Sequence, residues 1–192
     1  MENGRARTRG RPPATTAAGL SLIELLTAMA IASILTALAV PSFKYVTTSN
    51  RMTSEVNALL ADTQYARSEA IREGQTVTIC SSTDGATCAL STTWNQGWLV
   101  FSDVNNDGTV DPGDTVLRVQ KAFASPDSFV ANNGLTELTF NREGFAFTGV
   151  NTLVALHDPT NTTGFTRCLL ITSGTTVVST LATSPYALGT CT

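Results

Sequence analysis

The carboxylate of Glu24 lies inside an apolar run that extends from Leu20 to Val40. A helix of about 21 residues is about 31 Å long, which matches the hydrocarbon thickness of a bilayer. Ionisable side chains are rare at that depth because hydrocarbon offers a carboxylate no proton donor. We therefore expect Glu24 to have a charged partner in the membrane, rather than to reach the interface as a solvated charge.

A second group of oxygen-bearing side chains occurs in "DVNNDGTVDPGD", residues 103–114. Its spacing matches a calcium-binding loop, with Gly108 at the turn position. The candidate ligands are Asp103, Asn105, Asp107, the carbonyl of Thr109, Asp111 and Asp114. However, the flanking stretches resemble strands where an EF-hand requires helices, and an Asp replaces the bidentate Glu. We therefore favour a polar hairpin loop, with calcium as the single candidate cofactor.

Four cysteines remain to be explained: Cys80, Cys88, Cys168 and Cys191. Outside the cytoplasm four cysteines suggest two disulfides, which allow three connectivities. We favour Cys80 with Cys88, which bracket a turn-rich segment, and Cys168 with Cys191, which would tie the last strands to the C-terminus. Zinc is disfavoured because the chain has no CxxC pair and one histidine, His157.

The sequence contains little that would support catalysis. His157 is placed by its neighbours in a polar loop, "LHDPTNTTG", without a recognisable nucleophile motif. No pair of carboxylates is spaced as an acid and a base, and no glycine pattern would hold a phosphate. We therefore expect that the protein is not an enzyme.

The positive charge is concentrated before the apolar run. Residues 1–19 contain four arginines and one glutamate, a net charge of +3, whereas the rest has 8 basic and 14 acidic residues, a net charge of −6. This asymmetry predicts a cytoplasmic N-terminus and a body on the far side of the membrane. The apolar run exceeds the core of an ordinary secretory signal, so we expect it to stay in the membrane. Nucleic-acid binding is disfavoured, since the chain beyond Lys44 has 7 basic and 13 acidic residues.

The periodicity of the apolar residues predicts one helix from Leu20 to Glu73, followed by short strands. Pro41 should kink this helix because proline removes one backbone hydrogen bond, and Gly74 should end it. Strands are predicted at residues 76–80, 97–103, 115–120, 137–141, 145–149, 167–172 and 175–180, with a hairpin turn at "NREG". The fold class is therefore α+β, a long helix packed on an antiparallel β-rich domain.

The stretch "AAGLSLIELLTAMAIASILTALAVPSFKY" resembles the prepilin signature of type IV pilins and of the pseudopilins of type II secretion. That resemblance implies cleavage by prepilin peptidase between Gly19 and Leu20, N-methylation of Leu20, and a role for Glu24 in the registry of incoming subunits. The implied cut would leave an α-amine on Leu20, four residues before Glu24, so we expect Glu24 to pair with an amine of its own chain or of a neighbour. Pro41 falls where pilins have a helix-kinking proline. The usual phenylalanine after the cut is a leucine here.

The body resembles the GspH/FimT branch of minor pseudopilins, through "ARSEAIREGQTVTIC", "WNQGWLVFSDVNNDGTVDPGDTVLRV" and "FNREGFAF". The resemblance implies a pilin-like fold with a leader (1–19), a transmembrane or filament-core half of the helix (20–44), its periplasmic half (45–73) and a periplasmic β-rich domain (74–192). It implies a single-pass protein of the bacterial inner membrane that helps to initiate or cap a type II secretion pseudopilus or type IV pilus. Its partners would be other pilins, the prepilin peptidase and the assembly platform.

Two binding functions are alternatives to a purely structural role. One is DNA binding of the kind some FimT-like pilins perform through a Gly-Arg-x-Arg motif. At the matching place, "SGTTV", Gly174 is kept but Thr175 and Val177 replace the arginines, which disfavours it. The other is a calcium-binding tip module built on residues 103–114.

Overall fold

A computed structural model describes residues 19–148, 151–172 and 176–179 of the chain. These residues divide into two units, an N-terminal unit that ends at Phe43 and a body that begins at Lys44.

Helix α1 (Leu22–Glu73) runs through both units without interruption. It begins after Ser21, whose backbone carbonyl accepts hydrogen bonds from the backbone amides of Glu24 (3.0 Å) and Leu25 (3.1 Å). It ends at Gly74, which has a φ of 69° and donates its amide to the carbonyl of Ala70. The predicted helix is thus confirmed except for its first two residues. Its assignment continues through Pro41, and the kink there stays a prediction.

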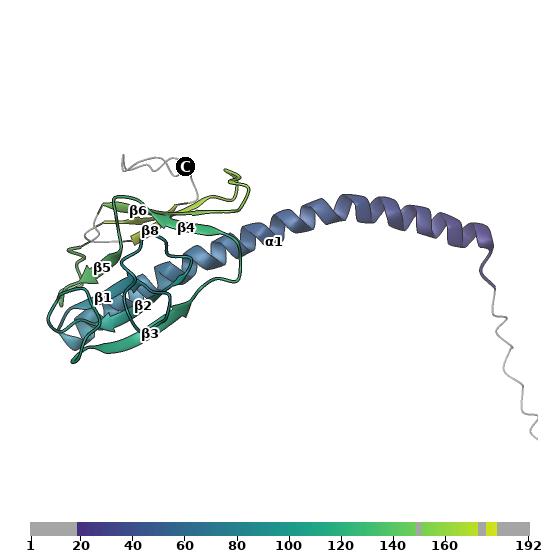
Figure 1. The fold of residues 1–192 in the computed structure, drawn as a ribbon. Helices are drawn as coiled ribbons and strands as arrows, with labels where there is room; N and C mark the ends of the chain where they lie inside the picture. The colour runs from purple at the N-terminus through teal and green to yellow at the C-terminus, as the bar shows by residue number, and fades with distance from the viewer. Residues whose placement is uncertain (1–18, 149–150, 173–175, 180–192) are drawn as a thin grey trace, which may run out of the picture. The chain divides into compact units, whose positions relative to one another are not determined.

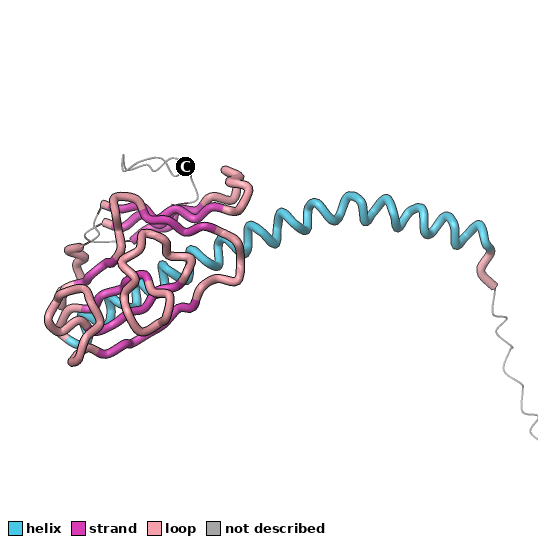
Figure 2. Tube along the Cα trace, in the orientation of Figure 1, coloured by secondary structure: helices cyan, strands magenta, loops and turns pink. Residues whose placement is uncertain are grey.

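Eight strands follow α1 and form two antiparallel sheets of four strands each within the described residues. The first sheet has the order β3-β2-β1-β5, and the second has the order β4-β6-β7-β8. In the view of Figure 1 the second sheet lies above the first, and Figure 2 shows the loops that join the strands. The strands are β1 (Val77–Ser81), β2 (Gly97–Ser102), β3 (Thr115–Lys121), β4 (Ser128–Ala131), β5 (Glu137–Phe140), β6 (Thr152–His157), β7 (Arg167–Ile171) and β8 (Thr176–Ser179).

The main core lies where the body half of α1 meets both sheets. One face of the helix is buried at the helical spacing, with the side chains of Met52, Val56, Leu59, Thr63, Ala66 and Ala70 all no more than 2% exposed. The two tryptophans, Trp94 and Trp98, are also buried in this core, and Trp98 contacts Phe123 and Phe129 edge to face or nearly so.

Strand β3 is an edge strand of the first sheet and is mostly exposed. Its pairing with β2 shifts register between Val100 and Phe101, which leaves Leu117 of β3 without a partner as a β-bulge. Arg118 and Lys121 are exposed on the same strand.

Five of the predicted strands in the described chain are found with small shifts of their ends, and the hairpin turn at residues 141–144 is confirmed by hydrogen bonds between Asn141 and Gly144 (2.8 Å) and between Asn141 and Phe145 (3.0 Å). Strand β8 matches the last prediction over Thr176–Ser179. The predicted strand at 145–149 is wrong, since residues 145–148 form a single bridge, Phe140 to Ala146, and Gly149 lies outside the described chain.

Strands β4 and β6 are absent from the sequence prediction. β6 lies between β4 and β7, and five of its six residues are apolar or threonine without polar alternation, as is usual for a strand covered on both faces. The prediction that His157 lies in a surface loop is also wrong, because the strand β6 was not predicted there. His157 is the last residue of β6, pairs with Ser128 of β4 and is half-buried, with its Nδ1 3.4 Å from the Thr166 hydroxyl.

Candidate functional site

The N-terminal half of α1 is the part of the described chain whose composition and exposure do not fit a soluble helix. From Leu20 to Val46 the large apolar side chains are between 53% and 78% exposed. This helix is long and apolar enough to cross a membrane. An apolar surface of this size requires lipid or other subunits to cover it.

Polar side chains in this half are satisfied by the helix itself. The hydroxyl of Thr27 donates to the carbonyl of Glu24 (2.9 Å), that of Ser33 to the carbonyl of Ala30 (2.7 Å), and that of Thr36 to the carbonyl of Ala32 (2.9 Å). A hydroxyl bonded to its own helix backbone leaves no unpaired donor in hydrocarbon. Hydroxyls are thus accommodated, whereas a carboxylate is not.

Glu24 lies in the first turn of α1. Its carboxylate forms no ion pair with any of the described residues. Leu20 precedes the helix and is 78% exposed, so the bond between Gly19 and Leu20 lies in a segment that a protease can reach. Gly19 also has open space around its Cα. Cleavage, methylation and registry remain predictions at these residues.

Several polar contacts that the sequence did not predict hold the body half of α1 against the strands and loops, and three of them involve the buried carboxylates of Asp62, Asp127 and Glu55. Asp62 is 5% exposed and accepts hydrogen bonds from Trp98 Nε1 (2.8 Å) and from Arg118 Nη1 (2.6 Å). The guanidinium of Arg118 also lies 4.1 Å from the ring centre of Tyr65, a cation–π contact. These residues tie α1 to β2 and β3.

The other two contacts join α1 to the loop between β3 and β4. Arg51 forms a bidentate pair with the buried carboxylate of Asp127, at 2.6 and 2.8 Å. Glu55 accepts a hydrogen bond from the Ser125 hydroxyl at 2.6 Å. Burial raises the pKa of Glu55, the Ser125 hydrogen bond lowers it, and the negative charge of Asp127 raises it, with a net upward shift. No sequence signal pairs residues that are 70 or more positions apart.

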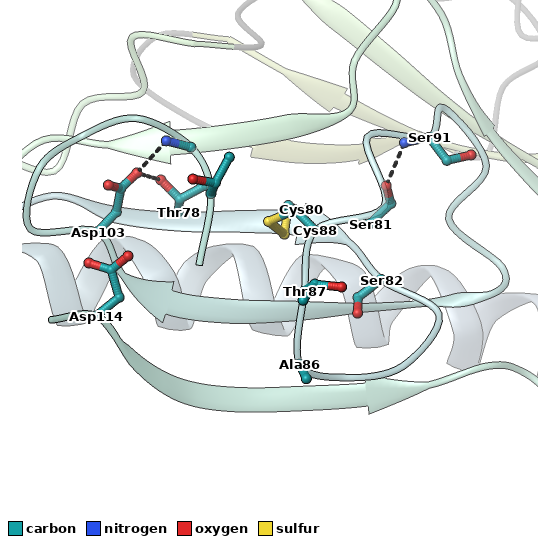
Figure 3. The surroundings of a disulfide bond; sticks show 12 residues. Thr78, Cys80, Ser81, Ser82, Ala86, Thr87, Cys88, Ser91, Asp103 and Asp114 are labelled. Carbon is teal, nitrogen blue, oxygen red and sulfur yellow. Dashed lines mark hydrogen bonds between the residues drawn. A yellow bond between two sulfur atoms is a disulfide. The ribbon is translucent and has the colours of Figure 1, made fainter. Parts of the chain in front are cut away.

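The disulfide between Cys80 and Cys88 is confirmed (Figure 3). It ties the end of β1 to the loop that follows, and the Asp84 carboxylate organises that loop by accepting hydrogen bonds from the amides of Ala86 and Thr87. Cys168 is buried in β7 and is not free. Cys191, its predicted partner, lies outside the described residues, so that pairing stays a prediction.

The predicted cation loop, residues 103–114, is a hydrogen-bonded hairpin connection between β2 and β3. Asp103 is fully buried, and its carboxylate accepts from Thr78 Oγ1 (2.8 Å; Figure 3) and from the amides of Asp107 and Gly108 (3.1 Å each). The carboxylate of Asp114 accepts from the amides of Val104 and Asp111. The side chain of Asn105 donates to both Asp107 and Asp111.

These bonds use the oxygens that a calcium ion would need. Among the residues that the structure describes, no three His, Cys, Asp or Glu side chains are grouped so that they could hold a metal ion. The fit of this loop to calcium is therefore poor, and calcium binding stays a prediction.

Comparison with known proteins identifies the family. Residues 55–175, well over half of the chain, match the family model described as type II transport protein GspH. No curated protein matches the chain. Two crystal structures of the type IV minor pilin FimU from Pseudomonas aeruginosa are similar, with a TM-score of 0.55 at 24% identity over 68% of this chain and 89% of FimU, and a TM-score of 0.52 at 23% identity over 66% and 91%. The two solved structures confirm the pilin-type fold. The match to the family model covers the body from α1 to β7, and the chain belongs to the GspH family of type II transport proteins.

Proposed function

We propose that this minor pseudopilin is cut between Gly19 and Leu20, methylated on Leu20, and then helps to initiate or cap a type II secretion pseudopilus or a type IV pilus. Prepilin peptidase and an inner-membrane assembly platform would be its partners before assembly. Its family and fold are those of structural subunits. The DNA-binding and calcium-binding alternatives have no specific observation in their favour.

The observation that supports this proposal most directly is the combination of an uncovered apolar helix with one unpaired carboxylate. The apolar half of α1 places Glu24 among exposed leucine and isoleucine side chains, and no described residue neutralises it. A neighbour's α-amine, generated at Leu20 by the cut, would provide a charge-assisted partner. Docking would then be favoured because an unpaired carboxylate in a membrane is costly.

The arginines before the span and Lys44 after it support the proposed topology. Arg5, Arg7, Arg9 and Arg11 would keep the N-terminus in the cytoplasm, with the body in the periplasm. Secretion pseudopilus and type IV pilus use the same kind of helix, so the genes that flank this one are the direct way to distinguish the two systems.

The test replaces Glu24 and follows the full-length chain in cells that assemble the filament. We expect Glu24→Ala and Glu24→Gln to remain in the membrane fraction but to fall at least about tenfold in the sheared filament fraction, an estimate from the loss of one charge-assisted contact. Thr27→Ala is the matched control, since it removes a polar group on the next turn that bonds only within the helix. Wild-type incorporation of Glu24→Gln would refute the registry role.

A further inference from the structure

Three segments of the body meet at the end where α1 enters it: residues 44–55 of α1, the β3–β4 loop (122–127) and the β6–β7 loop (158–166). The rings of Tyr45 and Phe165 are in contact, with centroids 4.9 Å apart. Arg167 donates from Nη2 to the Ser49 hydroxyl at 3.1 Å, and Arg51 pairs with Asp127. We name this region the helix-entry end.

The distance along the chain places this end at the surface of the bilayer. Val40 is the last residue of the apolar run, and Tyr45 follows five residues later, about 7 to 8 Å further along a helix. The headgroup layer extends about 5 to 8 Å beyond the hydrocarbon on each side. Tyr45 is 57% exposed, and its aromatic ring is of the type enriched at the level of the headgroups. Because Phe165 contacts Tyr45, the β6–β7 loop must reach the same level.

The charges of the helix-entry end suit a phospholipid surface, although the body as a whole is acidic. The carboxylates in these three segments, those of Glu55, Asp127 and Asp158, are 7%, 1% and 6% exposed. Lys44 is exposed, and the side chain of Arg51 is 39% exposed. Because Arg51 is paired with Asp127, phosphate groups would meet the cation of Lys44 and no exposed carboxylate from these segments.

The tip of the β6–β7 loop, residues 159–164, is exposed throughout and contains no ionisable side chain. Asp158 turns its carboxylate inward and fixes the shape of this loop. It accepts hydrogen bonds from the amide of Thr162 (2.6 Å) and from the amide of Thr160 (3.3 Å). The loop thus presents hydroxyls and backbone groups, which can exchange hydrogen bonds with headgroups at no cost in charge burial.

We propose that the helix-entry end docks on phospholipid headgroups of the membrane in which α1 is anchored, with Tyr45, Phe165 and residues 159–164 in contact with the lipid. This proposal rests on the membrane anchoring of α1. Docking would restrict the swing of the body about the end of the span, so that the unassembled subunit is held in a limited range of orientations.

The experiment uses the full-length chain in nanodiscs that contain phosphatidylglycerol and a phosphatidylcholine with a nitroxide on its headgroup. Phe165→Trp reports on the helix-entry end. Phe147→Trp is the matched control, because Phe147 is 45% exposed and its amide bonds to Thr139 of β5, which pairs with Thr78 shortly after the C-terminal end of α1. The native Trp94 and Trp98 are buried and supply a background that the wild-type chain measures.

We expect the nitroxide to quench the added fluorescence of Phe165→Trp at least twofold more than that of Phe147→Trp. Equal quenching in chains that co-purify with the nanodisc would overturn headgroup docking and leave the proposed function intact. A chain that fails to co-purify with the nanodisc would overturn the anchoring on which both depend.

A second pair of variants tests the contribution of the uncharged loop. Thr163 is exposed at the tip, so Thr163→Glu adds a charge without filling the core, and Thr163→Gln is its neutral control. In the Phe165→Trp background, Thr163→Glu should at least halve the quenching of the added tryptophan in phosphatidylglycerol nanodiscs, and Thr163→Gln should preserve it. If Glu leaves the quenching unchanged, or if Phe165→Trp is shielded only when another pilin subunit is added, the lipid is not the partner.

Discussion

At the scale of single residues, Asp62 of α1 is the acceptor that joins the helix to two strands of the first sheet. It is a buried carboxylate whose two oxygens accept from different strands, Trp98 Nε1 from β2 and Arg118 Nη1 from β3. Removal of a buried acceptor leaves the donor of Trp98 without a partner, and that loss costs more than the bond contributes on average.

Asp62→Ala should therefore lower the free energy of unfolding by about 2–4 kcal/mol, as a buried hydrogen-bonded group that loses its partner. Asp62→Asn should cost less, because an amide oxygen can still accept from Trp98. The control is Arg142→Ala, which breaks an exposed pair with Glu143 and should change stability by less than about 0.5 kcal/mol. Denaturant unfolding of the full chain in detergent measures all three, and equal losses for Asp62→Ala and Arg142→Ala would contradict this role.

At the scale of elements, the helix and the strands nearest to it were predictable from sequence, and the polar connections between them were not. Helix α1 has a local signal in its apolar spacing and in Gly74. Strands β1 to β3 have turn residues at both ends. Strand β4 has only four residues, and β6 is followed by a polar segment that masked its end. The partners of Arg51, Asp62 and Glu55 are set by tertiary packing, which one sequence does not display.

For the candidate assembly site, in contrast, the residues themselves could be predicted from the sequence. Gly19, Leu20 and Glu24 lie close together in the sequence, so their proximity along the chain can be recognised without a structure. The structure adds that the large apolar side chains around Glu24 are exposed.

The contact between α1 and the β3–β4 loop makes a prediction about pH. The pKa of Glu55 is raised in the folded chain above its ordinary value of 4.5, chiefly by burial. A raised pKa means that the folded state binds the proton more tightly, so this stabilisation is complete below about pH 4.5 and is lost as pH rises through the raised pKa. Glu55→Gln keeps the hydrogen-bond acceptor for Ser125 and removes the charge.

We therefore expect Glu55→Gln to be more stable than the wild type at pH 7 and to lose that advantage as the pH falls through the raised pKa towards about 4.5. Thermal melts of the full chain between pH 4 and pH 8 provide the measurement. Glu143→Gln is the control, since Glu143 is exposed and Arg142 lowers its pKa. A constant difference between Glu55→Gln and wild type at every pH would contradict a raised pKa for Glu55 in the folded chain.

At the scale of the whole molecule, the charge distribution separates an acidic body from a basic N-terminus. Beyond Lys44 the chain has 7 basic and 13 acidic residues, and two of the basic ones, Arg51 and Arg118, are paired with buried carboxylates. Phosphate backbones bind to clusters of free cations, so the body should repel nucleic acid.

The prediction is that the chain from Leu20 onward, which lacks the four arginines of residues 1–19, retains no duplex DNA on a filter at low salt in neutral detergent. The control is a double variant, Thr175→Arg with Val177→Arg, which restores the arginines of the Gly-Arg-x-Arg motif beside Gly174. Retention that appears in the double variant and falls steeply with salt would confirm that the missing cations decide the outcome. Tight, salt-sensitive retention by the wild type would overturn it.

The edge of the first sheet has a consequence for how such a subunit can exist at high density. Strand β3 is exposed at that edge, where identical copies crowded in one membrane could pair strand to strand and grow into disordered aggregates. The bulge at Leu117 bends the strand, and Lys121 places a positive charge at the edge where two copies would meet. The exposed edge of the body is thus a poor template for strand-to-strand pairing with a second copy.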